Sequence, residues 1–160
     1  MNIYKPMIGR TNGRNRRGGS VLVEFAACVI VLLFLLIGLI EFGWLIKNNL
    51  VVQNATREGA RVASIGRSTT EIKARINNSV RTAGVTDVVI SLKHAATTTD
   101  TFAAFPVDVT TKTPAQNGVP AGNMIEVVVT AKNKRLTGFS LIPIGRDIAS
   151  RVVMIREASQ

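Results

Sequence analysis

The sequence has little of several residue types on which covalent cross-links and chemical sites depend. Its 160 residues include one cysteine, one histidine, one tryptophan and one tyrosine. A single cysteine, Cys28, cannot form an internal disulfide, and one cysteine with one histidine cannot make a Cys/His zinc cluster. We therefore expect a fold that is stable without a disulfide, and we predict no metal site and no cofactor.

Sequence motifs for catalysis and phosphate binding are also missing. No serine lies in a nucleophile-elbow pattern, so His94 has no recognisable catalytic partner. The glycine-rich stretch 9–19 follows no predicted strand and lacks the Lys-Ser/Thr pair of a P-loop. We predict no catalytic residues and no enzymatic activity, and we expect His94 at a strand end in solvent.

Acidic residues are few, with 10 Asp+Glu against 20 Lys+Arg and a net charge of +10. Half of that excess lies in residues 1–19, which contain five basic residues and no acidic one. Polybasic tails bind nucleic acid or flank membrane segments. This tail has one aromatic residue, Tyr4, and no interleaved stacking pattern, so we predict no nucleic-acid binding.

A long apolar run follows the basic tail. Every residue from 25 to 40 is apolar or glycine, and the run continues beyond Glu41 to Ile46. About 20 apolar residues in a helix cross a bilayer, whereas the apolar region of a secretory signal is shorter, about 7 to 15 residues. We therefore predict a retained span at 25–46, surrounded by membrane lipid. The alternative is a core helix of a soluble protein, but apolar residues on all sides favour the membrane.

The charges that flank the run predict its orientation. Basic residues before a span remain in the cytoplasm, so the chain after Lys47 should lie outside the cytoplasmic membrane. Trp44 should then lie near the outer interface. Glu41 follows Glu24 by 17 positions, about 25 Å of helix, which places it near the same interface. There it meets water or pairs with a neighbouring subunit.

The stretch RRGGSVLVEF at residues 16–25 leads into this run. Gly19 is followed by four residues and then by Glu24 and Phe25, a pattern that resembles the processing motif of type IV pilin-like proteins. The resemblance implies that a prepilin peptidase removes the leader 1–19 by cutting between Gly19 and Ser20. It also implies that Glu24 of one subunit neutralises the new Ser20 amine of the next. Considered by itself, Glu24 can also be a simple interfacial carboxylate.

Other stretches narrow this resemblance to one family. GLIEFGWL ends the apolar run, NATREGARVAS follows it, and EVVVTAKNKRLTGFSLIPIGRDIASRVVMIRE lies late in the chain. These stretches resemble the TadE-like family, pilin-related proteins of tight-adherence pilus assembly systems. The resemblance implies a minor pilin or pseudopilin of the bacterial cytoplasmic membrane, whose partners are other pilin-like subunits and the assembly platform. The alternative is a single-pass anchored accessory domain that binds a partner outside any filament.

A helical pattern continues after the apolar run. Ala55, Gly59 and Ala63 recur every four residues and form a face of small residues, which allows the domain's own sheet, or another helix in an assembly, to approach closely. We predict one long helix over 20–67 that ends near Gly66. An extracytoplasmic α/β domain is expected over 68–160.

A second helix should begin at Ser68, which forms a capping box with Glu71, and should close at Gly84. The apolar period then changes to two, which predicts strands at 85–93, 124–132 and 147–156, with 105–112 as a fourth at an edge. The expected fold class is α+β and pilin-like: a long N-terminal transmembrane helix, a short helix and a three- or four-stranded antiparallel sheet.

Overall fold

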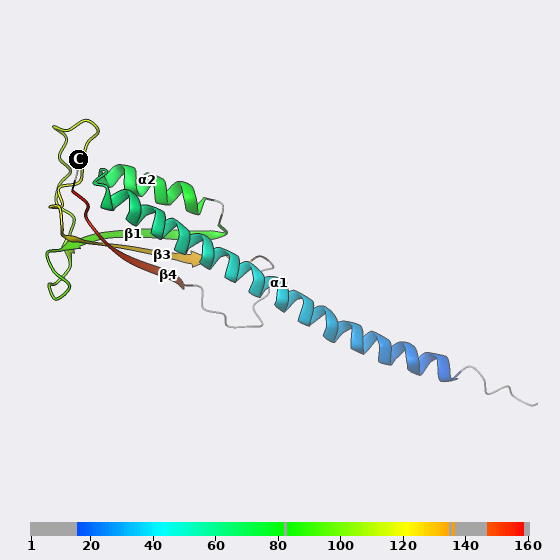
Figure 1. The fold of residues 1–160 in the computed structure, drawn as a ribbon. Helices are drawn as coiled ribbons and strands as arrows, with labels where there is room; N and C mark the ends of the chain where they lie inside the picture. The colour runs from blue at the N-terminus through cyan, green and yellow to red at the C-terminus, as the bar shows by residue number, and fades with distance from the viewer. Residues whose placement is uncertain (1–15, 82, 135, 137–146, 159–160) are drawn as a thin grey trace, which may run out of the picture. The chain divides into compact units, whose positions relative to one another are not determined.

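The computed structural model describes residues 16–81, 83–134, 136 and 147–158 (Figure 1). The chain forms two compact units, Met1–Ile40 and Glu41–Gln160. The described elements follow the order α1, α2, β1, β2, β3 and β4. The fold is therefore α+β and pilin-like, as the sequence predicted. Most of the predicted leader, residues 1–15, lies outside the described residues.

Helix α1 extends from Arg16 to Ser64. It begins four residues before the predicted start at residue 20. In the first unit most of its large apolar side chains are exposed, from 45% at Ile40 to 72% at Val23, while Val29 and Ile37 are partly buried. Among the described residues, this is the one helix long and apolar enough to cross a membrane, which suggests a membrane anchor.

The C-terminal end of α1 is fixed by Gly66. Its φ of +86° is readily adopted only by glycine. The amide of Gly66 donates to the Ala63 carbonyl at 3.0 Å, and the Arg67 amide donates to the Val62 carbonyl at 3.3 Å. These two bonds form a Schellman motif, which satisfies carbonyl groups that the helix itself leaves unpaired. The prediction that the helix ends near Gly66 is confirmed.

Helix α2 extends from Thr69 to Val80. The Glu71 amide donates to the Ser68 hydroxyl at 3.3 Å, which confirms Ser68 as the N-cap. The prediction that Gly84 closes this helix is wrong, because the helix ends four residues earlier. Ile72, Ile76 and Val80 are its buried face, and Val80 ends that apolar stripe.

Four antiparallel strands form one sheet in the order β2-β1-β3-β4. The strands are β1 (Val85–Ala95), β2 (Ala103–Ala104), β3 (Met124–Asn133) and β4 (Asp147–Ile155). Three of them confirm the predicted alternation. The fourth was predicted in the wrong segment: β2 ends at Ala104, and within 105–112 Val109 forms an isolated bridge to Gln116 while the Phe105 amide donates to the Leu92 carbonyl.

Asp108 gives a physical reason for this difference. Its carboxylate accepts hydrogen bonds from the Thr69 amide at 3.0 Å and from the Thr69 hydroxyl at 2.7 Å. A carboxylate at a helix N-terminus also interacts favourably with the helix dipole. The segment that contains Asp108 therefore contributes to the start of α2 instead of extending the sheet.

Both helices of the second unit lie on one face of the sheet (Figure 1). The hydrophobic core between them takes side chains from α1, α2, β1, β3 and β4, and includes Val52, Ala63, Ile72, Ile76, Leu92, Ile125, Val127, Val129 and Ile148. On the opposite face of the sheet, the Glu126 carboxylate is 5% exposed and pairs with Arg151. The alternation of apolar and polar residues thus matches the two faces of the sheet.

Candidate functional site

The residues of the predicted processing motif lie in the first two turns of α1. Gly19, Ser20, Glu24 and Phe25 are all exposed within the chain. A Cβ built on Gly19 would meet no atom within 4 Å, so the packing of this chain does not require glycine there. Among the described residues, no ion pair or hydrogen bond involves the Glu24 carboxylate. The Glu24 carboxylate is therefore exposed in an apolar helix and has no partner among the described residues.

The small residues of α1 lie in the core of the second unit. Ala55 and Ala63 are at most 1% exposed, and Gly59 is also buried. A Cβ on Gly59 would overlap the Cδ1 atom of Ile76 in α2. The close neighbour of this glycine is therefore the second helix of the same chain, not the sheet.

Glu41, Trp44 and Asn48 of α1 make a row of polar contacts to the ends of β1 and β3, which we call the polar seam. Asn48 is fully buried, and its Nδ2 donates to Asn133 Oδ1 at 2.6 Å. Its Oδ1 accepts the Gly84 amide at 3.1 Å. The side chain of Asn48 thus joins the residue before β1 to the last residue of β3.

The other two members of the polar seam bind backbone groups that follow β3. Trp44 Nε1 donates to the Lys134 carbonyl at 3.0 Å, and the Trp44 ring occupies the space that a Cβ on Gly84 would need. The Leu136 amide donates to Glu41 Oε1 at 3.3 Å. Glu41, predicted to face water or a neighbouring subunit, therefore has a hydrogen-bond partner within its own chain.

A buried arginine holds the other end of the same helix segment. Arg156 follows β4, is 5% exposed, and donates from Nη1 to the Ser64 carbonyl at 3.2 Å. The Glu157 amide donates to the same carbonyl at 2.9 Å. A cation near the carbonyl groups at a helix C-terminus is stabilising. The Arg-Glu pair in the late stretch of the sequence thus connects the end of the sheet to the end of α1.

Glu58 connects the two helices through an ion pair. Its Oε1 lies 3.3 Å from Arg61 Nη2 and 3.0 Å from Arg75 Nε of α2. The hydrogen bonds from Arg61 and then from Arg75 lower the pKa of the Glu58 carboxyl below its usual value of 4.5. Glu58 is therefore ionised at neutral pH, and it pairs with both arginines.

His94 lies at the end of β1, as predicted, but it is partly buried instead of lying in solvent. Its Nδ1 is buried without a hydrogen-bond partner. Its ring lies 6.4 Å from that of Phe105 in an edge-to-face arrangement. Within the described ranges, no three His, Cys, Asp or Glu residues lie close enough together to hold a metal ion.

Of the polar seam, Glu41 was a predicted site residue, whereas Trp44 and Asn48 were not, and neither was the buried Arg156. Asn48 follows an apolar run, where an asparagine is ordinarily read as a water-facing residue at the membrane boundary. Its partners lie 36 and 85 residues further along the chain, a separation that sequence periodicity does not report. The Arg-Glu pair at the end of the late stretch, Arg156 and Glu157, was the one sequence feature that pointed to the Arg156 contact.

A long apolar N-terminal helix, a short helix and a four-stranded antiparallel sheet define a pilin-like α+β protein. Residues 19–61 match the model of the TadE-like protein family. The family points to a protein associated with the Tad pilus, is not known to contain enzymes, and implies other Tad pilus assembly components as partners. No curated protein and no solved structure matches the chain.

Proposed function

We propose that this protein is a minor pilin or pseudopilin of a tight-adherence pilus system, matured by a prepilin peptidase that cuts between Gly19 and Ser20. The observation that carries the proposal is the exposed Glu24 carboxylate, five residues after Gly19 in an apolar helix, without a partner among the described residues. The match to the TadE-like family begins at Gly19 and includes Glu24, which further supports it.

The role of the cut follows from its chemistry. Hydrolysis of the Gly19–Ser20 peptide bond creates a charged amine on Ser20, beside the first apolar residues of α1. In an assembly of packed helices, Glu24 of one subunit neutralises the Ser20 amine of the next. An ion pair in a site of low dielectric is favourable only when both partners are present, so the pair sets the register between neighbouring subunits. Phe25 contributes apolar surface beside it.

In this proposal the protein is anchored once in the bacterial cytoplasmic membrane. The basic leader 1–19 is cytoplasmic, residues 25–46 cross the lipid, and the α/β domain lies outside. A reporter enzyme that is active only outside the cytoplasm, fused after Gln160, should be active. A stable fusion with a silent reporter would reverse the orientation.

Processing is tested by N-terminal sequencing of the protein isolated from membranes that contain the peptidase. The first residue should be Ser20. Because a Cβ on Gly19 has free space in this chain, Gly19→Leu should leave the fold intact while it blocks cutting. A mature protein that still begins with the leader would instead identify a membrane-anchored accessory domain that never enters a filament.

The role of Glu24 is tested by Glu24→Gln, with cleavage measured by mass and subunit contacts measured by cross-linking. Cleavage should be normal and cross-linking reduced. The loss of one partner from a dry ion pair costs about 3 to 5 kcal/mol, and less where water reaches the pair. Glu41→Gln is the matched control, since Glu41 already accepts a hydrogen bond within its own chain. Normal cross-linking of Glu24→Gln would show that Glu24 is only an interfacial carboxylate.

A further inference from the structure

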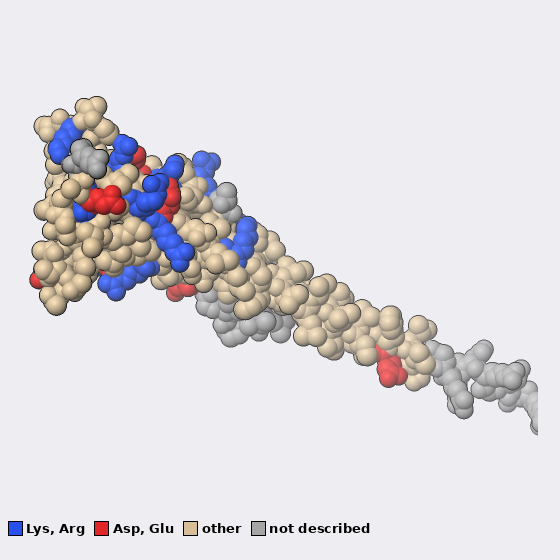
Figure 2. Space-filling view, in the orientation of Figure 1, with Lys and Arg blue, Asp and Glu red and all other residues tan. Residues whose placement is uncertain are grey.

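Positive charge is concentrated in the two helices of the second unit. Residues 57–81 contain six basic and two acidic residues, a net charge of +4, whereas residues 82–160 contain eight and six, a net charge of +2. Figure 2 shows Lys and Arg side chains gathered over α1 and α2. This surface has no role in the proposed Glu24 contact, and its charge favours a partner that carries carboxylates.

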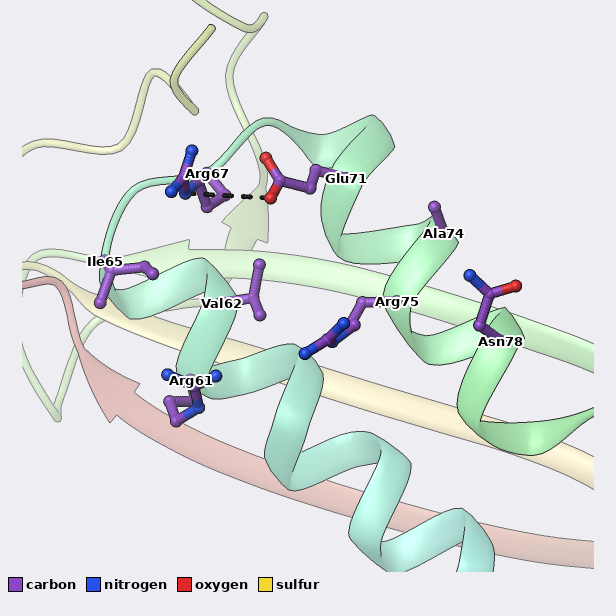
Figure 3. Close-up of a pocket in the computed structure, with 8 residues that line it drawn as sticks. All are labelled: Arg61, Val62, Ile65, Arg67, Glu71, Ala74, Arg75 and Asn78. Carbon is purple, nitrogen blue, oxygen red and sulfur yellow. Dashed lines mark ion pairs between the residues drawn. The ribbon is translucent and has the colours of Figure 1, made fainter. Parts of the chain in front are cut away.

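Three arginines of this set line one groove between the two helices (Figure 3). Arg61 comes from α1, Arg67 from the connection that follows it, and Arg75 from α2, around a volume of about 350 Å³. Apolar side chains line the same groove, and one of them, Ile65, is 40% exposed. The groove therefore offers guanidinium groups and apolar surface to the same ligand.

The guanidinium groups in the groove remain partly exposed, although Glu58 already pairs with Arg61 and Arg75. The side chains of Arg61, Arg67 and Arg75 are 59%, 39% and 58% exposed. Arg67 Nε lies 3.8 Å from Glu71 Oε1, which is too long for a hydrogen bond. Exposed ion pairs contribute only about 0 to 1 kcal/mol, so a second carboxylate can readily share or replace these contacts.

We propose that this groove binds an acidic peptide segment of another protein, in which two carboxylates flank one apolar side chain. The planar guanidinium group binds a carboxylate through paired hydrogen bonds, and Ile65 provides apolar contact between the charges. Arg61 follows Glu41, at the end of the proposed anchor, by 20 residues, about 30 Å of helix. This distance is several Debye lengths, so salt screens the charge of lipid headgroups there and a protein partner is favoured over a membrane surface. The surface is independent of cleavage at Gly19.

The test uses the full-length protein in nanodiscs of neutral phosphatidylcholine. In a Cys28→Ser background, Asn78→Cys places an environment-sensitive dye on the groove lining. The probe is acetyl-Glu-Leu-Glu-amide, and its uncharged control is acetyl-Gln-Leu-Gln-amide. The acidic peptide should give a saturable signal, with affinity at least about tenfold above that of the control.

Two arginine variants distinguish the groove from general attraction. Arg67→Gln should weaken binding of the acidic peptide about fivefold, the upper end for one half-exposed ion pair. Arg57→Gln removes an exposed arginine of α1 that does not line the groove, and it should change affinity by less than about twofold. Equal binding of the two peptides, or equal effects of the two variants, would overturn the proposal. Anionic phosphatidylglycerol vesicles that bind the groove more tightly than the peptide would also overturn it, and would identify a lipid surface instead.

Discussion

Replacement of Asn48 by alanine should destabilise the second unit strongly. The change removes the hydrogen bond to Asn133 Oδ1 and the acceptor for the Gly84 amide, at a position that is fully buried. Each buried group left without a partner costs about 1 to 3 kcal/mol, so we expect a loss of about 2 to 5 kcal/mol. This is a large part of the stability of a typical domain, about 5 to 15 kcal/mol.

The assay is urea unfolding of the full-length protein in detergent, followed by the fluorescence of Trp44. This residue is the one tryptophan of the chain, and it belongs to the polar seam, so its emission reports the affected contacts directly. Asn49→Ala is the matched control, because Asn49 is exposed and only accepts a bond from Gln53 at 3.3 Å. The control should change stability by less than about 0.5 kcal/mol. Similar unfolding midpoints for the two variants would refute the assignment of Asn48 as a structural centre.

Three further predictions concern the contacts between elements. Gly59→Leu should lower the free energy of unfolding by about 1 to 3 kcal/mol, because the new side chain overlaps Ile76, while Gly43→Leu, where a Cβ meets no atom within 4 Å, should not. Arg156→Met should lower it by about 1 to 3 kcal/mol, since the C-terminal carbonyl groups of α1 lose a charged donor; an unchanged thermal midpoint would contradict this. The lowered pKa of Glu58 means that its ion pairs stabilise the fold above pH 4.5 and lose this effect as pH falls through the lowered value. The difference in urea midpoint between the wild type and Glu58→Gln should therefore vanish in acid, and a difference that persists there would exclude the ion pairs as its cause.

The elements that the sequence predicted well are those with local signals. Period-two alternation in three segments gave three strands, because one face of the sheet packs on the helices and the other does not. Ser68 and Gly66 marked a helix start and a helix end through their preferences for N-cap and left-handed positions. The apolar run identified the N-terminal helix by length alone.

The elements that the sequence predicted poorly depend on contacts between distant residues. The two-residue strand β2 has no periodicity to detect, and Asp108 was placed in a strand although its carboxylate caps α2. Asp87, with a φ of +51°, lies where the β1–β3 register shifts, and a bulge of this kind has no apolar pattern. The polar seam was missed for the same reason, because its contacts join residues that are far apart in the sequence.

In the proposed membrane anchor, the polar seam would limit which sides of the helix after Glu41 are available to lipid. Glu41, Trp44 and Asn48 bind groups of the folded domain, whereas Phe42, Ile46 and Leu50 remain 45% to 55% exposed. The uninterrupted apolar stretch before them, residues 25–40, is 16 residues long, about 24 Å of helix. That length is shorter than the hydrocarbon thickness of about 30 Å, so in the proposed anchor the exposed Phe42 and Ile46 would complete the span beside the seam.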